Sequence, residues 1–214
     1  MSISEIREET AKFGTAEFYV AIGKAFVTMC AVIPFLFVIE AIDQALSSGY
    51  LDQAGGILPH RIDGLDGILF SPFLHAGWGH LYANAVPLIL VGTFALAGGT
   101  RRFLYSTAVI MLVSGLGVWF VGSSNTVVVG ASGVIFGYLG LLVTRGLVEH
   151  SWWNLAVAAF IGLLYWYQLY NILPTDQPVS WQGHLLGLLG GATAAVLFRR
   201  RRPPNLDSTP TLEF

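Results

Sequence analysis

Apolar and polar positions occur in blocks along this chain, and six apolar blocks are each close to the ~20 residues that a helix needs to cross a bilayer. Five of the six contain no Asp, Glu, Lys or Arg, and the first contains Glu40 near its end. Continuous apolar runs of this length predict transmembrane helices. We therefore expect an all-α, polytopic membrane protein whose six helices cover residues 25–42, 81–99, 103–121, 127–144, 152–173 and 179–198.

The composition supports a membrane protein and excludes other classes. Of the 214 residues, 54% are hydrophobic and 11% are charged, whereas a soluble domain has about 25% charged residues. The net charge of -2, with no basic amphipathic face, argues against a nucleic-acid partner. Cys30 is the single cysteine, so the chain can form neither an internal disulfide nor a thiolate metal site. We expect no metal and no organic cofactor.

The basic residues fall almost entirely on one side of the six expected helices. Short cytoplasmic loops retain Lys and Arg during insertion, so we expect this side to be cytoplasmic. Arg61 is the exception and lies in the long connection 43–79 on the other side. Both termini are then cytoplasmic, and we expect the plasma membrane as the location. The ten basic residues on the cytoplasmic side are Arg7, Lys12, Lys24, Arg101, Arg102, Arg145, Arg199, Arg200, Arg201 and Arg202.

This topology divides the chain into three segments. Residues 1–24 form a cytoplasmic N-terminal segment, which lacks the continuous apolar core of a cleavable signal peptide. Residues 25–198 form one membrane domain, and residues 199–214 form a basic tail that we expect to be disordered. Lys24 and Glu40 lie near the two ends of the first helix, where their side chains can reach the interface.

Polar residues gather where the second, fourth and sixth helices begin, on the external side. His80 and Asn84 are one helical turn apart at the start of the second helix, so their side chains share a face. Ser132 and His184 lie near the starts of the fourth and sixth helices. At a rise of 1.5 Å per residue, each is roughly 8 Å below its helix end. Three helices are therefore expected to present polar groups in one layer.

Each of these residues alone has an ordinary structural explanation. The Gly-x-Ser-Gly sequence at residues 130–133 occurs in a chain with 25 glycines, and small residues commonly mark close helix packing in membranes. His184 alone is compatible with a hydrogen bond between helices, and Asn84 alone is typical of a residue that joins helices. His80 alone is compatible with a place at the interface. Intramembrane ionisable groups are rare, and their occurrence at one depth favours a catalytic site.

Ser132 and His184 are suited to nucleophilic catalysis. A serine hydroxyl is a poor nucleophile until a neighbouring base accepts its proton, and a neutral histidine does this near pH 7. No Asp or Glu lies in the external halves of the second to sixth helices, and Asp176 is in a loop. We therefore predict a dyad and not a triad.

The oxyanion of a tetrahedral intermediate also requires hydrogen-bond donors. The Asn84 amide, the His80 imidazole and the backbone N–H of Ser132 are donors of the right type. Gly130 and Gly133 allow the chain and a substrate to approach the serine closely.

Small residues also recur along the fourth and sixth helices. They predict that these two helices approach closely, which brings Ser132 near His184. A role in packing alone is compatible with the same pattern. The residues are Gly133, Gly137 and Gly140 on the fourth helix, and Gly183, Gly187 and Gly191 on the sixth.

The chain resembles the rhomboid intramembrane serine proteases over all six helices. His80 and Asn84 match the family's His-x-x-x-Asn on the second helix, and residues 130–133 match Gly-x-Ser-Gly at the start of the fourth. His184 matches a histidine of the sixth helix that is followed by spaced glycines, the first of which is Gly187. The resemblance implies a rhomboid-like bundle of six helices.

The resemblance also implies a role for each of these residues. Ser132 would be the nucleophile, His184 the general base and acid, and His80 with Asn84 the lining of the oxyanion hole. Many relatives carry a tyrosine one turn after the serine, where this chain has Phe136, whose ring can still support the imidazole by stacking. The family's Trp-Arg pair in the first long loop is missing.

The implied activity is hydrolysis of a peptide bond in or near the external end of a transmembrane segment. The implied partners are the lipid bilayer and the substrates, which are single-span or otherwise membrane-anchored proteins. The aromatic residues 165–167 fit an interfacial belt, and by resemblance they belong to a lateral gate for substrate. A catalytically inactive relative that binds membrane proteins is the main alternative, although a pure binder does not need both Ser132 and His184. A small transporter is a more distant alternative, because the chain lacks intramembrane carboxylates in these helices and a repeat between its halves.

Overall fold

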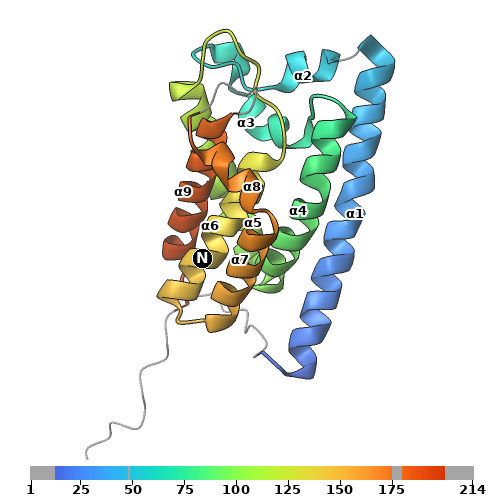
Figure 1. Ribbon diagram of the computed structural model, residues 1–214. Coiled ribbons are helices and arrows are strands. Elements are labelled where there is room, and N and C mark those ends of the chain that lie inside the picture. The colour runs from blue at the N-terminus through green and yellow to red at the C-terminus, as the bar shows by residue number, and fades with distance from the viewer. Residues whose placement is uncertain (1–12, 48, 175–179, 201–214) are drawn as a thin grey trace, which may run out of the picture.

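The computed structural model describes residues 13–47, 49–174 and 180–200, and these form a bundle of helices (Figure 1). No β-strand occurs within those ranges, and a single antiparallel bridge joins Ile57 to Val128. The all-α prediction is therefore confirmed. The long helices are α1 (Ala16–Ser47), α4 (Trp78–Ala97), α5 (Thr100–Val121), α6 (Ser132–Val148), α7 (Trp152–Leu164) and α9 (Trp181–Leu197). Short helices are α2 (Tyr50–Gly55), η2 (Ile62–Gly64), α3 (Gly67–Phe70), η3 (Ser71–Phe73), α8 (Trp166–Leu169) and η4 (Tyr170–Ile172).

Three of these helices are long and apolar enough to cross a membrane, at Ala16–Leu46, Trp78–Ala97 and Thr100–Val121. A fourth span results if α7 and the helices that follow it count as one, although they are bent by 88°. By the same criteria α6 is a shorter apolar helix of 17 residues. The length and composition of the described helices therefore support three or four spans of the six that were expected.

The starts of the first and fourth helices differ most from the sequence prediction. The first helix begins at Ala16, nine residues early, because the Thr15 hydroxyl accepts a hydrogen bond from the Phe18 N–H (3.3 Å) and so caps it. The fourth begins at Ser132 and not at Val127, because residues 127–131 leave the helix to contact the connection between α1 and α4. Residues 1–12 and 201–214, which include most of the predicted terminal segments, lie outside the described ranges.

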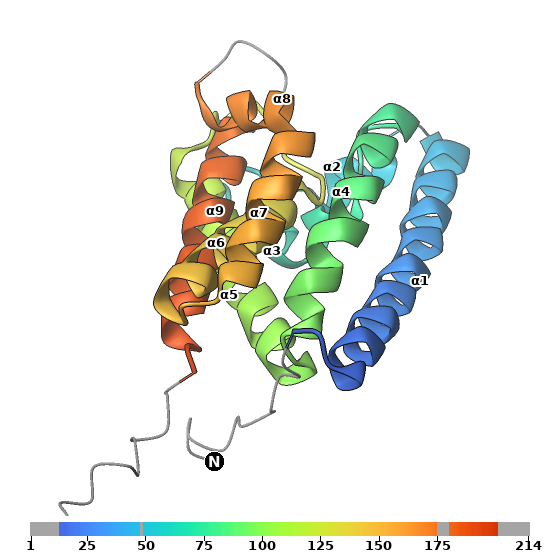
Figure 2. The same ribbon diagram turned by 60° about the horizontal axis from the view of Figure 1, so that its bottom comes forward.

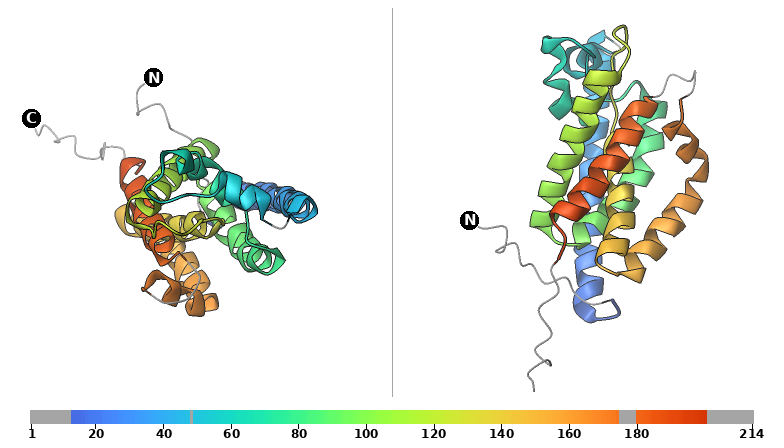
Figure 3. Two further views of the ribbon diagram at one scale, coloured as in Figure 1. Left: turned by 90° about the horizontal axis from the view of Figure 1, so that it is seen from above. Right: turned by 90° about the vertical axis from the view of Figure 1, so that its left-hand side faces the viewer.

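Glycines bring α6 and α9 into backbone contact, as the small-residue pattern predicted. A Cβ at Gly187 would overlap the carbonyl oxygen of Gly133, and a Cβ at Gly191 would overlap that of Gly137. α9 also packs against α5, and α1 lies at the edge of the bundle against α4 (Figures 2 and 3). Ser132 and His184 lie in the first turns of the two helices that approach most closely.

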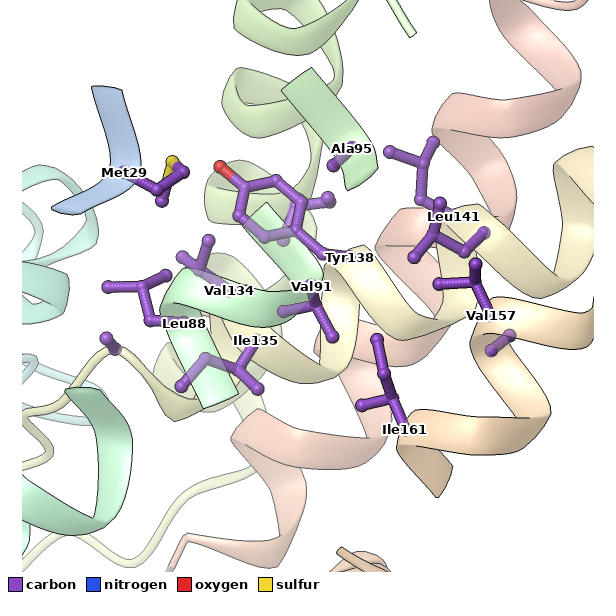
Figure 4. Close-up of a cluster of buried hydrophobic side chains, with 14 of the residues drawn as sticks. Met29, Leu88, Val91, Ala95, Val134, Ile135, Tyr138, Leu141, Val157 and Ile161 are labelled. Atoms are coloured by element: carbon purple, nitrogen blue, oxygen red, sulfur yellow. The ribbon is translucent and has the colours of Figure 1, made fainter. Parts of the chain in front are cut away.

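An apolar core joins α1, α4, α6 and α7. Figure 4 shows Met29, Leu88, Val91 and Ile161 converging on residues of α6. Tyr138 is 2% exposed within this core, and its hydroxyl lies 2.8 Å from the Thr107 hydroxyl. The core thus fixes α6, which carries Ser132 at its first position.

Two charged groups that were expected at the cytoplasmic surface are buried between helices. Arg102 is 3% exposed and forms an ion pair with Glu149. Arg145 is 2% exposed, and its guanidinium donates to the Ala95 carbonyl (3.4 Å) and to the Ser106 hydroxyl (3.3 Å). These arginines therefore join α4, α5 and α6 at the end of the bundle opposite Ser132.

Candidate active site

Ser132 is the first residue of α6 and follows residues 127–131, which lie outside the helix. Gly130 in this segment has a φ of 119°, which side-chain-bearing residues rarely adopt. A Cβ there would lie 2.6 Å from the ring of His80. The Gly130 N–H donates to the Ser71 carbonyl (2.9 Å). Gly130 is thus required both for the turn into α6 and for the space that the His80 ring occupies.

His184 lies in the first turn of α9, and its ring contacts Ser132 directly. The Nε2 atom is 2.8 Å from the Ser132 hydroxyl, and Nδ1 is 2.9 Å from the carbonyl oxygen of Asn171. A carbonyl oxygen only accepts hydrogen bonds, so Nδ1 carries a proton, and in the neutral ring Nε2 accepts the hydroxyl proton of Ser132. This is the tautomer that a general base requires.

Phe136 supports the histidine ring from α6. The two rings are stacked, with centroids 4.6 Å apart and planes inclined by 25°. Phe136 is one turn after Ser132, so the nucleophile and the ring that supports its partner share one helix face. The Asn171 carbonyl takes the orienting position that a carboxylate has in a triad. Sequence patterns carried no signal for it, because it is a backbone atom.

His80 and Asn84 lie on α4 at the same end of the bundle. The Ala76 N–H donates to His80 Nδ1 (3.3 Å), so Nε2 carries the proton of the neutral ring. His80 lines the same cavity as Ser132 and His184. Asn84 is 5% exposed, and its amide donates to the His80 carbonyl (2.9 Å). Asn84 is not among the residues that line the cavity.

A cavity of about 720 Å³ connects these groups. Ser132, His184 and His80 line it together with Gly130 and Gly133. Residues of α5 and of the 57–76 connection also line it. The cavity is large enough for a peptide segment to approach the serine hydroxyl.

Two further residues support the site and were not among the predicted site residues. His75 is 1% exposed, and its Nε2 accepts the Ala131 N–H (3.4 Å), which holds the residue before the serine. Burial and the neighbouring His80 lower the pKa of His75 to about 3, so its ring is neutral. Ser114 of α5 is buried, and its hydroxyl donates to the Gly183 carbonyl (2.9 Å), next to His184.

The fold and the site together define a class: a helical membrane protein in which a serine and a histidine from different helices are hydrogen-bonded inside the bundle. The family model for the Rhomboid domain matches residues 64–201, which include all of these groups. The chain therefore belongs to the rhomboid family.

Sequence similarity to known proteins extends beyond the matched domain. Uncharacterized proteins of Mycobacterium tuberculosis and Mycobacterium bovis are 39% identical to it over 178 residues, which cover 79% of this chain and 73% of theirs. An uncharacterized protein of Mycobacterium leprae is 36% identical over 179 residues, covering 80% and 70%. A Bacillus subtilis protein named "Putative rhomboid protease YdcA" is 30% identical over 138 residues, covering 60% of this chain and 65% of its own length.

Proposed function

We propose that the chain is an intramembrane serine endopeptidase that hydrolyses a peptide bond near the external end of transmembrane segments. The observation that carries this proposal is the 2.8 Å contact between Ser132 Oγ and His184 Nε2, with Nδ1 bonded to the Asn171 carbonyl. A protein that only binds its partners gains nothing from a base aligned on a hydroxyl, so this geometry favours catalysis over the inactive alternative.

The reaction follows from the positions of these atoms. Ser132 Oγ attacks the scissile carbonyl carbon while His184 Nε2 accepts the hydroxyl proton, and the Asn171 carbonyl stabilises the resulting imidazolium through Nδ1–H. The tetrahedral intermediate collapses when Nε2 returns this proton to the leaving amine. Water then attacks the acyl-enzyme carbonyl while His184 Nε2 accepts its proton. Nε2 returns this proton to Ser132 Oγ as the ester C–O bond breaks, which releases the carboxylic acid and regenerates the dyad. No cofactor takes part in these steps.

The developing oxyanion is stabilised on the α4 side of the serine. The Ser132 N–H is at the N-terminus of α6, where the helix dipole favours negative charge. His80 lines the shared cavity with its Nε2 atom next to Gly130, and the Asn84 amide donates to the His80 carbonyl. Asn84 thus acts as a positioning residue in this arrangement, while His80 is the side-chain donor.

Replacing His80 by Ala should lower kcat for a membrane-anchored substrate by about 100-fold, which is the usual effect of removing one oxyanion donor. KM should change little, because the donor acts on charge that is absent in the ground state. Steady-state kinetics in lipid measure both constants. His60→Ala is the matched control, because His60 is an exposed histidine of the neighbouring connection whose ring contacts Ser124 and the Phe120 carbonyl. Equal kcat values for the two variants would exclude the proposed role of His80.

The expected substrate is a single-span or otherwise membrane-anchored protein. A peptide bond inside a helix is shielded by its own hydrogen bonds, so segments with Gly or Pro near the external end, which unwind easily, should be preferred. Entry between α4 and α7 is supported by a small cavity lined by Pro87, Phe136, Ile161 and Tyr165, among others. Since the Phe136 ring also stacks on His184, this route leads to the dyad.

The proposal includes the topology that the basic residues predict. All six long helices would cross a plasma membrane, with both termini in the cytoplasm and Ser132 toward the external face. The bend of 88° after α7 and the 17-residue length of α6 would place Ser132 in a thinned part of the membrane domain that is open to external water. Hydrolysis of the acyl-enzyme requires that external water reach Ser132.

A fluorophosphonate probe tests the nucleophile directly, because such probes phosphonylate activated serines. The purified chain in lipid vesicles should form one adduct, located on Ser132 by peptide mass spectrometry, and His184→Ala should form none. The chain has other buried serines, such as Ser106 and Ser114, which serve as internal controls. A folded protein whose Ser132 stays unmodified would favour the inactive binding protein.

A further inference from the structure

Three carboxyl groups meet at the junction of α1 and α2, away from the site described above. Glu40 and Asp43 lie one turn apart on α1, and Asp52 lies on α2. Their residues are 2%, 2% and 8% exposed. Glu40 was expected to reach the membrane interface, and the structure instead directs it inward. The burial of three acidic side chains in one place requires an explanation, because buried carboxylates are normally paired with cations.

The hydrogen bonds of this cluster satisfy only part of it. Asp43 accepts from the Gly49 N–H (2.8 Å) and the Leu51 N–H (2.5 Å), which fixes the chain as it enters α2. Glu40 Oε1 accepts from the Gln44 amide (2.9 Å). In the described part of the chain, Glu40 Oε2 and Asp52 Oδ1 are buried without a hydrogen-bond partner.

No cation neutralises these carboxyl groups among the described residues. The two ion pairs there are Arg61 with Asp63 and Arg102 with Glu149, and neither includes the cluster. The described residues also contain no group of three or more His, Cys, Asp or Glu side chains that could hold a metal ion. Three negative charges buried together without compensation would repel strongly, so a proton is the simplest ligand that stabilises the group.

Asp52 is the member on which this proton is held. Burial, together with the charges of Asp43 and Glu40, raises the pKa of Asp52 to about 6. The other side chains packed at the C-terminal end of α2 are apolar, at Leu74 and Val127 among others. The titratable groups whose charge acts on Asp52 are Asp43 and Glu40 of α1.

We propose that Glu40, Asp43 and Asp52 form a proton-binding site that docks α2 onto α1 when Asp52 is protonated and loosens this contact when Asp52 is ionised. The sign follows from linkage. Because the folded state binds the proton more tightly than the unfolded chain, this site stabilises the fold below about pH 4. Its contribution to the free energy of unfolding decreases as the pH rises to about 6 and is absent above that.

The docked helix is connected to the segment that carries Ser132. The Gly56 N–H donates to the Asp52 carbonyl (2.9 Å), and Ile57 then exchanges two backbone hydrogen bonds with Val128 (2.9 and 3.0 Å). Val128 is two residues before Gly130, which contacts the His80 ring. These backbone contacts form a continuous path from α2 to residues 127–131, which precede the nucleophile. Undocking of α2 should therefore change the position of these residues.

Amide hydrogen exchange of the full chain in lipid at pH 5.0 and pH 7.5, corrected for intrinsic rates, tests the docking. Exchange at residues 49–57 should rise by about threefold or more at pH 7.5 in the wild type, because local opening becomes easier. The rise should be absent in Asp52→Asn, which keeps the neutral form at both pH values. Asp66→Asn is the matched control, because Asp66 is an exposed carboxyl of the same connection. A rise of equal size in Asp52→Asn would overturn the proposal.

Thermal unfolding gives a second measurement that does not depend on catalysis. The melting temperature of Asp52→Asn relative to wild type should increase by about 4 °C between pH 5.0 and pH 7.5. If the difference in melting temperature did not depend on pH, the proton would be excluded as the ligand. The same conclusion would follow if the difference appeared only when calcium chloride was added to the wild type.

The effect on Ser132 rests on the proposed function and is measured separately. The ratio of the fluorophosphonate labelling rate in Asp52→Asn to that in wild type should be higher at pH 7.5 than at pH 5.0. Using this ratio removes the titration of His184, which both proteins share. Absence of any labelling would contradict the proposed function and leave the exchange result standing. A ratio that does not change with pH would contradict only the connection to the site.

Discussion

Replacing His184 by Ala should lower kcat/KM for a membrane-anchored substrate by about 10⁴-fold, because the serine hydroxyl then has no base to accept its proton. Among the described residues that line the cavity, no other side chain is placed to take over this role. The other histidine of the cavity, His80, accepts from the Ala76 N–H through Nδ1 and directs its proton-bearing nitrogen toward Gly130. Cleavage rates in lipid, measured at several substrate concentrations, give the ratio directly.

The control for this experiment is His150→Ala. His150 is an exposed histidine in the turn between α6 and α7, at the end of the bundle opposite Ser132. This variant should keep the wild-type rate. If His184→Ala retained a rate within tenfold of wild type, another group would have to be the base, and the dyad would be wrong.

Gly191→Ala should have the largest effect on stability. An alanine normally stabilises a helix interior by about 1 kcal/mol relative to glycine. Here the added methyl group would overlap the Gly137 carbonyl oxygen and force α9 away from α6. We expect a loss of about 3 kcal/mol in the free energy of unfolding. The melting temperature should fall by roughly 6–12 °C, and the separation of Ser132 from His184 should abolish labelling by the fluorophosphonate probe.

Gly23→Ala provides the matched comparison for this substitution. Gly23 lies inside α1, and a Cβ there would have no neighbouring atom within 4 Å. Thermal unfolding of both variants in the same lipid separates helix propensity from packing. Equal melting temperatures would show that α6 and α9 can move apart without loss, and the close contact of these helices would then not maintain the dyad.

The parts of the fold that the sequence predicts are those with strong local signals. Apolar length places α4 and α5 within a few residues, and the glycine spacing predicts the close packing of α6 on α9. The contact between Ser132 and His184 follows from that packing, because each lies in the first turn of its helix. These features depend on periodicity and residue size, which are visible in a single chain.

The features that the sequence does not predict depend on distant contacts. Residues 127–131 are apolar like a helix, but their backbone groups bond to Ile57 and Ser71, which are far away in the chain. Hydropathy therefore extended the fourth helix too far. The orienting partner of His184 is the Asn171 carbonyl, and a backbone atom has no sequence signature.

The inward position of Glu40 was missed for a related reason. A carboxyl group near the end of an apolar helix can reach water or turn inward, and only its neighbours decide between these. Asp43 and Asp52 lie on the inner side and belong to different segments of the chain. The acidic cluster therefore becomes visible only once α2 is placed against α1.

The most direct test of the proposed protease is cleavage of single-span reporter proteins by the purified chain in lipid vesicles, with Ser132→Ala as the comparison. We expect the wild type to produce two fragments whose masses place the cut near the external end of the reporter's helix. Ser132→Ala should produce no fragments, although its melting temperature should equal that of the wild type. Cleavage at the same bond and rate by Ser132→Ala would contradict the assignment of Ser132 as the nucleophile.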